Sequence, residues 1–179
     1  MSNPEFAYLL GMVTGKGTII RGRTATEIRI EIPHKNLIIE GMDAQTSVKA
    51  SITDIKEILE PLIGVRISVT SLGNKTILLF EKINADFLIR EINRYMGNLI
   101  SCKEFRIPNE IFMAPSDIKK EFLRGLADVT AHIRRSNVAY GIPYNHRVYI
   151  EIPVNWFLAV DVANLLMDLD IPVHTIDWG

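Results

Sequence analysis

An internal repeat constrains the fold of this 179-residue chain more than any other feature of its sequence. Two short strings occur twice in the same order: L-x-G at residues 9–11 and 123–125, and I-E-I-P at residues 30–33 and 150–153. In the second copy the strings are six residues further apart, which a longer hairpin turn at residues 140–145 accommodates. Self-similarity of this kind predicts two structural units of the same design.

Each copy is predicted to begin with an apolar helix. Asn3 followed by Pro4 is typical of a helix start, because asparagine caps free N–H groups and proline fits the first turn. The second helix is expected to begin after Pro115, with Ser116 or Asp117 as its cap.

A hairpin with one buried face is predicted after each helix. Residues 27–32 read EIRIEI and residues 147–152 read RVYIEI, so apolar and polar side chains alternate. In the second copy we expect Val148, Ile150 and Ile152 to face the core. Because antiparallel sheets commonly keep one face in solvent, this pattern favours an α+β fold with a polar sheet face.

The rest of the first copy predicts four further elements. They are an amphipathic helix at 47–63, strands at 65–70 and 76–81 around a Gly73-Asn74 turn, and a helix at 84–96 between an Asn84 cap and Gly97. The unit therefore has the order αββαββα.

These elements divide the chain into two pseudo-symmetric αββαββα units at 1–97 and 117–179, joined by a linker at 98–116. The second unit is expected to contain a helix from residue 155 or 156 to about 169 and a strand at 172–178. It is shorter than the first, so we expect it to be incomplete, with further domains after Gly179.

Composition narrows the class of protein. The chain carries a net charge of −1, is 47% apolar, and has neither a signal-peptide pattern nor an apolar run long enough for a membrane span. Cys102 is the single cysteine, which excludes an internal disulfide and fits a reducing compartment. We therefore expect a cytoplasmic protein with no membrane partner.

Basic charge is concentrated in two segments of this nearly neutral chain. Residues 16–29 hold four basic side chains and one acid, and residues 132–147 hold three arginines and two histidines without an acid. A local basic patch steers a polyanion to a protein surface. The predicted nucleic-acid contacts are Lys16, Arg21, Arg23, Arg29, His132, Arg134, Arg135, His146 and Arg147.

The two helices resemble the motif helices of the LAGLIDADG homing endonucleases. The first copy reads LLGMVTGKG (residues 9–17) and the second LRGLADVTA (residues 123–131), within FLRGLAD at 122–128. The resemblance implies that the motif helices pack at a pseudo-twofold axis, with Gly11 and Gly125 at their interface. It also implies that two antiparallel sheets form a saddle over the major groove of duplex DNA.

The chain departs from that family where the resemblance implies catalysis. In the family, an acid at the eighth motif position of each copy holds a divalent metal, and here these positions are Lys16 and Thr130. A lysine repels a cation, and metal-assisted hydrolysis needs anionic oxygen ligands. Asp128, at the sixth position, does not rebuild the site. We therefore expect no catalytic residue, no metal and no cofactor.

The sequence thus predicts a duplex DNA-binding domain without cleavage activity of its own. Such a domain would serve as the recognition part if the chain belongs to a longer nuclease. Tyr140 and Tyr144 in the long turn either touch sugar or base or pack within the turn. Two alternatives stay open: a relic homing endonuclease or intron maturase that binds structured RNA, and a protein-interaction domain whose basic strands meet acidic partners.

Overall fold

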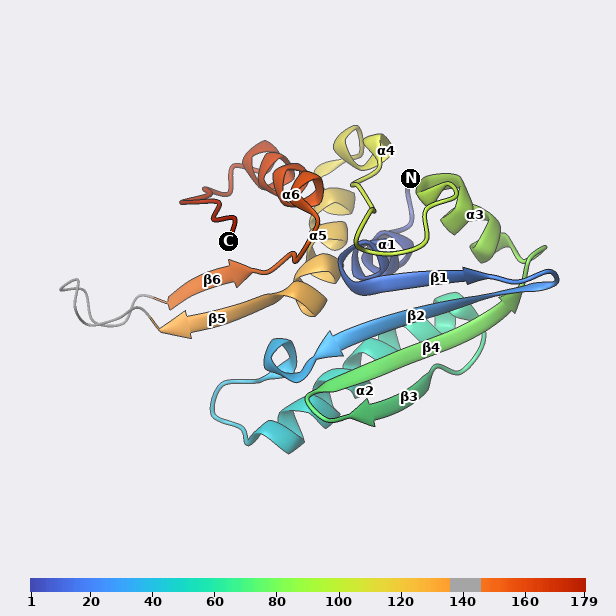
Figure 1. The fold of residues 1–179 in the computed structure, drawn as a ribbon, viewed down its shortest axis with the longest axis horizontal. Helices are drawn as coiled ribbons and strands as arrows, with labels where there is room; N and C mark the ends of the chain where they lie inside the picture. The colour runs from blue at the N-terminus through green and yellow to red at the C-terminus, as the bar shows by residue number, and fades with distance from the viewer. Residues whose placement is uncertain (136–145) are drawn as a thin grey trace.

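The chain has the predicted α+β architecture. The computed structural model describes residues 1–135 and 146–179. In chain order the elements are α1 (Pro4–Lys16), β1 (Gly17–Arg21), β2 (Ala25–Pro33), the 3-10 helix η1 (His34–Leu37), α2 (Ala44–Ile63), β3 (Ser68–Leu72), β4 (Lys75–Ile83), α3 (Phe87–Met96), α4 (Asn109–Phe112), α5 (Ser116–Thr130), β5 (Ala131–Arg135), β6 (His146–Ile150) and α6 (Trp156–Asp168) (Figure 1). No helix in these ranges is long and apolar enough to cross a membrane.

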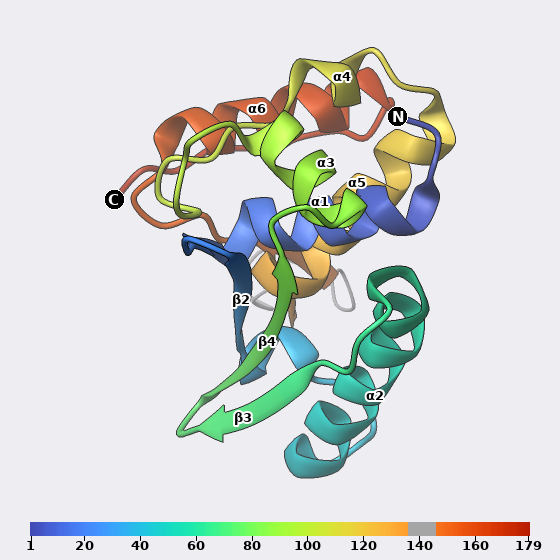
Figure 2. The same ribbon diagram turned by 90° about the vertical axis from the view of Figure 1, so that its right-hand side faces the viewer.

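The larger sheet is four-stranded and antiparallel, in the order β1-β2-β4-β3. Its covered face carries Ile28, Ile30 and Ile32, which are buried as the alternation predicts, and α2 lies on that side of the sheet (Figure 2). The buried apolar residues of α2 are Ile52, Ile55, Leu59 and Ile63. No helix of the described residues lies over the opposite face (Figures 1 and 2).

Helices α1 and α5 lie side by side at the centre of the fold (Figures 1 and 2). Gly11 and Gly125 lie where the two helices cross. A Cβ added to Gly11 would come within 2.0 Å of the Phe122 carbonyl oxygen, and one added to Gly125 within 1.9 Å of the Tyr8 carbonyl oxygen. Only glycine permits so close an approach of the two backbones.

Helix starts agree with the predictions in part. Asn3 caps α1 by accepting a hydrogen bond from the Phe6 N–H at 3.0 Å. For α5 the predicted caps are wrong: Pro115 is the N-cap residue, no side chain caps the helix, and Ser116 and Asp117 already belong to its first turn. A carboxylate in the first turn still interacts favourably with the helix dipole.

The predicted Asn84 cap is also wrong. Helix α3 begins at Phe87, where Asp86 accepts a hydrogen bond from the Leu88 N–H at 2.8 Å. The Asn84 side chain is committed to the β1–β2 turn instead. Its amide donates to the carbonyls of Gly22 and Arg23, and its oxygen accepts from the Thr26 hydroxyl at 2.7 Å.

Within residues 1–135 and 146–179, the smaller sheet consists of β5 and β6 in antiparallel pairing. The prediction that Val148 faces the core is wrong, since its side chain is 67% exposed. The predicted strand at 172–178 is also wrong: these residues form no ladder and pair with neither strand. Trp178 packs edge-on against Trp156 at the start of α6 instead, with ring centroids 5.3 Å apart.

The segment 98–116, predicted as a linker, contributes to the core. Phe105, Ile107 and Ile111 are buried, and the segment includes α4. Its residues 100–102 also cover the outer edge of β1, with the Ile19 N–H donating to the Ile100 carbonyl at 2.7 Å.

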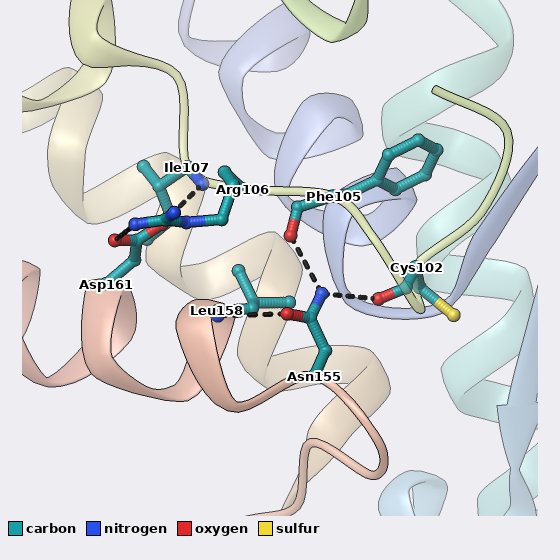
Figure 3. A network of polar contacts seen from close by, with 7 residues as sticks. All are labelled: Cys102, Phe105, Arg106, Ile107, Asn155, Leu158 and Asp161. Carbon is teal, nitrogen blue, oxygen red and sulfur yellow. Dashed lines mark hydrogen bonds and ion pairs between the residues drawn. The ribbon is translucent and has the colours of Figure 1, made fainter.

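A polar network fastens this segment to α6 (Figure 3). Asn155 caps α6 and donates to the Cys102 and Phe105 carbonyls, each at 2.8 Å. Six residues further along, Asp161 accepts two hydrogen bonds from Arg106 and one from the Ile107 N–H. The second unit is thereby joined to the segment that follows the first.

Candidate nucleic-acid interface

The uncovered face of the larger sheet, hereafter the open face, is the candidate interface on the first unit. Strand alternation and register assign its residues: Thr18, Ile20, Glu27, Arg29, Glu31, Lys75, Ile77, Leu79, Glu81 and Ile83. These side chains are half-buried or exposed, whereas their neighbours along β2 and the middle of β4 are buried. The open face is therefore accessible to a ligand.

The open face is mixed in charge rather than basic. Arg29 forms an ion pair with Glu27 at 3.2 Å, and Lys75 forms one with Glu31 at 2.9 Å. The Nε–H of Arg29 is buried and has no acceptor among the described residues, so this guanidinium retains unused hydrogen-bonding capacity.

Arg21 lies on the covered face, contrary to its predicted role on an exposed polar face. It shares that face with Ile19 because the two residues are two apart on β1. Its guanidinium donates to the Asn93 side chain and to the Leu99 and Gly97 carbonyls at 2.6–2.9 Å. Arg21 thus ties β1 to the end of α3.

Arg23 lies at the exposed tip of the β1–β2 hairpin. The hydrogen bonds from the Asn84 amide to this turn, described above, hold its backbone, and the Gly22 N–H donates to the Ala25 carbonyl at 2.8 Å. The Arg23 side chain forms no ion pair with a carboxylate in the described residues. A cation on an anchored turn is well placed to meet a phosphate.

Lys16 and Thr130 occupy equivalent places at the C-terminal ends of α1 and α5. Lys16 is half-buried in the last turn, where a cation interacts favourably with the helix dipole. The Thr130 hydroxyl is buried and donates to the Leu126 carbonyl at 2.6 Å.

On the second hairpin, Arg147 is exposed and forms no ion pair with the described carboxylates. His132 is less accessible than predicted: its side chain is 9% exposed, 3.6 Å from the Glu151 carboxylate and stacked on Tyr149. The backbones of Arg134, Arg135 and His146 belong to β5 and β6. Their side chains lie outside what the structure describes, as do Tyr140 and Tyr144 entirely.

The residues present do not fit the divalent metal site that the family resemblance implies. Neither Lys16 nor Thr130 supplies an anionic oxygen, and the Thr130 hydroxyl is bonded within its own helix. Asp128 is directed toward α1, where it accepts the Tyr8 hydroxyl at 2.5 Å. The described ranges 1–135 and 146–179 contain no group of three His, Cys, Asp or Glu residues able to hold a metal ion.

Asp128 instead belongs to a network at the flank of the helix pair. Tyr8 is fully buried, and the Arg124 guanidinium lies 4.3 Å from the centre of its ring. Arg124 in turn forms an ion pair with Glu121 at 2.7 Å. Burial raises the pKa of the Asp128 carboxyl, and this effect exceeds the opposing effect of the Tyr8 hydrogen bond.

The Asp128→Asn variant is expected to be at least as stable as the parent chain at pH 7. Because the pKa of Asp128 is higher in the folded than in the unfolded state, the parent loses stability as pH rises from about 4 through the folded-state pKa. Asparagine still accepts the Tyr8 hydroxyl and does not ionise. Urea unfolding at pH 4 and pH 7 should show a smaller pH-dependent loss in the variant. A loss of more than about 1 kcal/mol at pH 7 would contradict this account, since a neutral hydrogen bond is worth about that much.

Asn84, which the sequence predicted only as a helix cap, and Asn36, which it did not single out, are structural contributors to the interface. Asn84 anchors the Arg23 turn, and the Asn36 amide donates to the Ala131 carbonyl at 2.6 Å, joining η1 to the start of β5. Asn84 follows directly on a strand and precedes a helix, a position that favours a helix cap, so local pattern alone gives no signal of its long-range partners.

Comparisons with known proteins give only distant structural matches. No family model matches the sequence, and no curated protein matches it. Solved structures with a similar arrangement include the homing endonuclease I-DmoI as a variant in complex with its target DNA in the presence of Mn, with a TM-score of 0.49, 15% identity, and 93% of this chain and 76% of that chain covered. I-DmoI in complex with DNA and Mn gives a TM-score of 0.43, 12% identity and coverage of 96% and 98%. A structure of mesophilic I-DmoI variants gives 0.41, 11%, and 93% and 95%. Identity this low says nothing about individual residues.

Proposed function

We propose that this chain is a duplex DNA-binding domain with a homing endonuclease-like double unit, and that it does not cleave DNA itself. One observation carries the proposal: two antiparallel hairpins begin directly at the C-terminal ends of two closely packed helices, α1 and α5 (Figure 1). Two-stranded ribbons fit the major groove of B-DNA. The packed helix pair thus presents one hairpin within the four-stranded sheet and a second, two-stranded hairpin.

The composition of the open face supports base contacts, and cations outside that face support phosphate contacts. In the major groove, arginine pairs with guanine, a carboxylate accepts from cytosine, and apolar groups touch the thymine methyl. Arg29, Glu27 and the half-exposed Ile20 offer all three kinds of contact. Lys16, Arg23 and Arg147, which form no ion pair in the described residues, suit the phosphates.

The proposed absence of cleavage rests on the side chains at the C-terminal ends of α1 and α5, which are poor ligands for a divalent metal. Lys16 places an ammonium group where a metal would need a carboxylate. The Thr130 hydroxyl already donates a hydrogen bond to the Leu126 carbonyl. A further consequence is that DNA binding should not depend on added Mg²⁺.

The double variant Arg23→Ala/Arg147→Ala is expected to bind duplex DNA more weakly whatever its sequence. If each arginine contacts one phosphate, the slope of log K against log salt falls by roughly 0.9 for each lost contact. Fluorescence anisotropy with labelled duplex DNA across a salt series measures this slope. The matched control is Arg66→Ala/Arg90→Ala, which removes the same charge from exposed positions off the open face.

Equal loss of affinity in the two double variants would overturn the proposal, because net charge rather than the ribbon surface would then be responsible. Tighter binding of duplex RNA than duplex DNA under the same conditions would favour the structured-RNA alternative. Binding of neither nucleic acid by the folded parent chain would leave the protein-interaction alternative.

A further inference from the structure

The two hairpins correspond residue by residue but differ sharply in what covers them. Gly17 pairs with Ile30 in the first hairpin, and Ala131 pairs with Ile150 in the second, so the shared I-E-I-P strings stand in the same register. Two residues further along, Ile19 faces Ile28 and Ile133 faces Val148.

These corresponding apolar pairs have opposite environments. Ile19 and Ile28 are 1% and 0% exposed, whereas Ile133 and Val148 are 68% and 67% exposed. In the first unit β2 is also paired along its second edge by β4, while β6 has no such neighbour among the described strands. The second hairpin therefore presents both an open strand edge and a bare apolar face, a combination that recruits additional strands.

We propose that β6 is the docking edge for an antiparallel β-hairpin of a protein partner. The strand next to β6 would carry apolar residues at alternate positions and an acid opposite Arg147. This is recognition by strand addition, in which backbone hydrogen bonds supply affinity and alternate side chains supply specificity. The proposal does not depend on the proposed DNA-binding function.

The first unit shows what chemistry fits this edge. On β2, Ile28 faces Phe80 and Ile30 faces Leu78 of β4. The same register transferred to β6 sets Phe80 against Val148 and Leu78 against Ile150, so apolar residues meet on one face. A slip by one residue would bring apolar residues opposite polar ones.

Charge distinguishes the two docking edges. Glu81 of β4 stands directly opposite Glu27 on β2, a like-charged pair. The residue of β6 that corresponds to Glu27 is Arg147, so an acid at the position of Glu81 would meet a cation there. The β6 edge therefore favours an acidic residue at this position of its partner more strongly than β2 does.

The test uses the full chain and a labelled peptide of residues 67–83, the β3–β4 hairpin, cyclised because isolated hairpins are marginally stable. We expect saturable binding in fluorescence anisotropy and slowed amide exchange in β6. The substitution Val148→Asp should abolish binding, and Arg147→Glu should weaken it by roughly fivefold. Because both residues are exposed, neither change should unfold the chain.

A charge reversal separates docking on β6 from other modes of binding. A peptide with Glu81→Lys should bind the Arg147→Glu chain better than the unchanged peptide does. If the peptide binds the Val148→Asp and Arg147→Glu chains as tightly as the parent chain, the proposal is overturned, because the peptide would then be replacing the chain's own β4. Absence of binding would also overturn it. If the parent chain self-associates, Val148→Asp does not, and the peptide binds neither, the occupant of the β6 edge is a second copy of the chain instead.

Discussion

Replacing Gly125 by alanine is expected to lower the free energy of unfolding by at least about 3 kcal/mol, the upper part of the range for overpacked interiors. The added Cβ would lie 1.9 Å from the Tyr8 carbonyl oxygen and 2.8 Å from its carbon. These are backbone atoms of α1, so no side-chain rotation relieves the overlap. The two helices must move apart, which loosens the packing along their whole contact. Urea unfolding followed by circular dichroism measures the loss.

Gly73→Ala is the matched control for this prediction. Gly73, unlike the helical Gly125, has a conformation unfavourable for other residues, with φ +59, but nothing lies within 4 Å of an added Cβ. Its substitution should cost only about 1–2 kcal/mol. Combining Gly11→Ala with Gly125→Ala should cost less than the sum of the single changes, because helices already forced apart accommodate the second methyl group. Similar losses for Gly125→Ala and Gly73→Ala would show that the crossing is not tightly packed.

Much of the fold could be predicted because many local sequence patterns match the elements and the burial that the structure shows. The alternation in residues 27–32 matches strand β2, and the Gly73-Asn74 turn joins β3 to β4. Local patterns gave wrong predictions where the burial of a side chain depends on residues far away in the sequence. Val148 has the spacing of a core residue, but burial requires something to cover it, and no pattern in residues 147–152 reports whether that cover exists.

The surroundings of individual side chains in the two basic segments were harder to predict than the strands that carry them. Counting charge along the sequence treated all the arginines of these segments alike. Arg21 is two residues from Ile19, so strand periodicity alone assigns it to the covered face. Its partners, Asn93, Gly97 and Leu99, lie more than seventy positions away, and no local signal points to them. The ion pair between Arg29 and Glu27, by contrast, follows directly from their spacing on one strand face.

Replacing Asp161 by alanine should destabilise the chain by about 2–3 kcal/mol, because it removes a buried acceptor of several hydrogen bonds. The Asp161 carboxylate is largely buried and accepts from the Arg106 Nε and a terminal nitrogen, each at 2.7 Å, and from the Ile107 N–H at 3.2 Å (Figure 3). Arg106 is half-exposed and can return to water after the change. The buried Ile107 N–H cannot return to water, and leaving it without an acceptor accounts for much of the lost stability.

Asp168→Ala on the same helix is the control. Asp168 forms an ion pair with Lys119 but is 46% exposed, so its loss should cost no more than about 1 kcal/mol. Asp161→Asn should fall between the two, since an amide oxygen accepts one of these hydrogen bonds but carries no charge for Arg106. Urea unfolding at pH 7 gives the three values on one scale. If Asp161→Ala costs no more than Asp168→Ala, the network would be a surface ion pair only. Helix α6 would then be held against residues 105–107 by its apolar contacts alone.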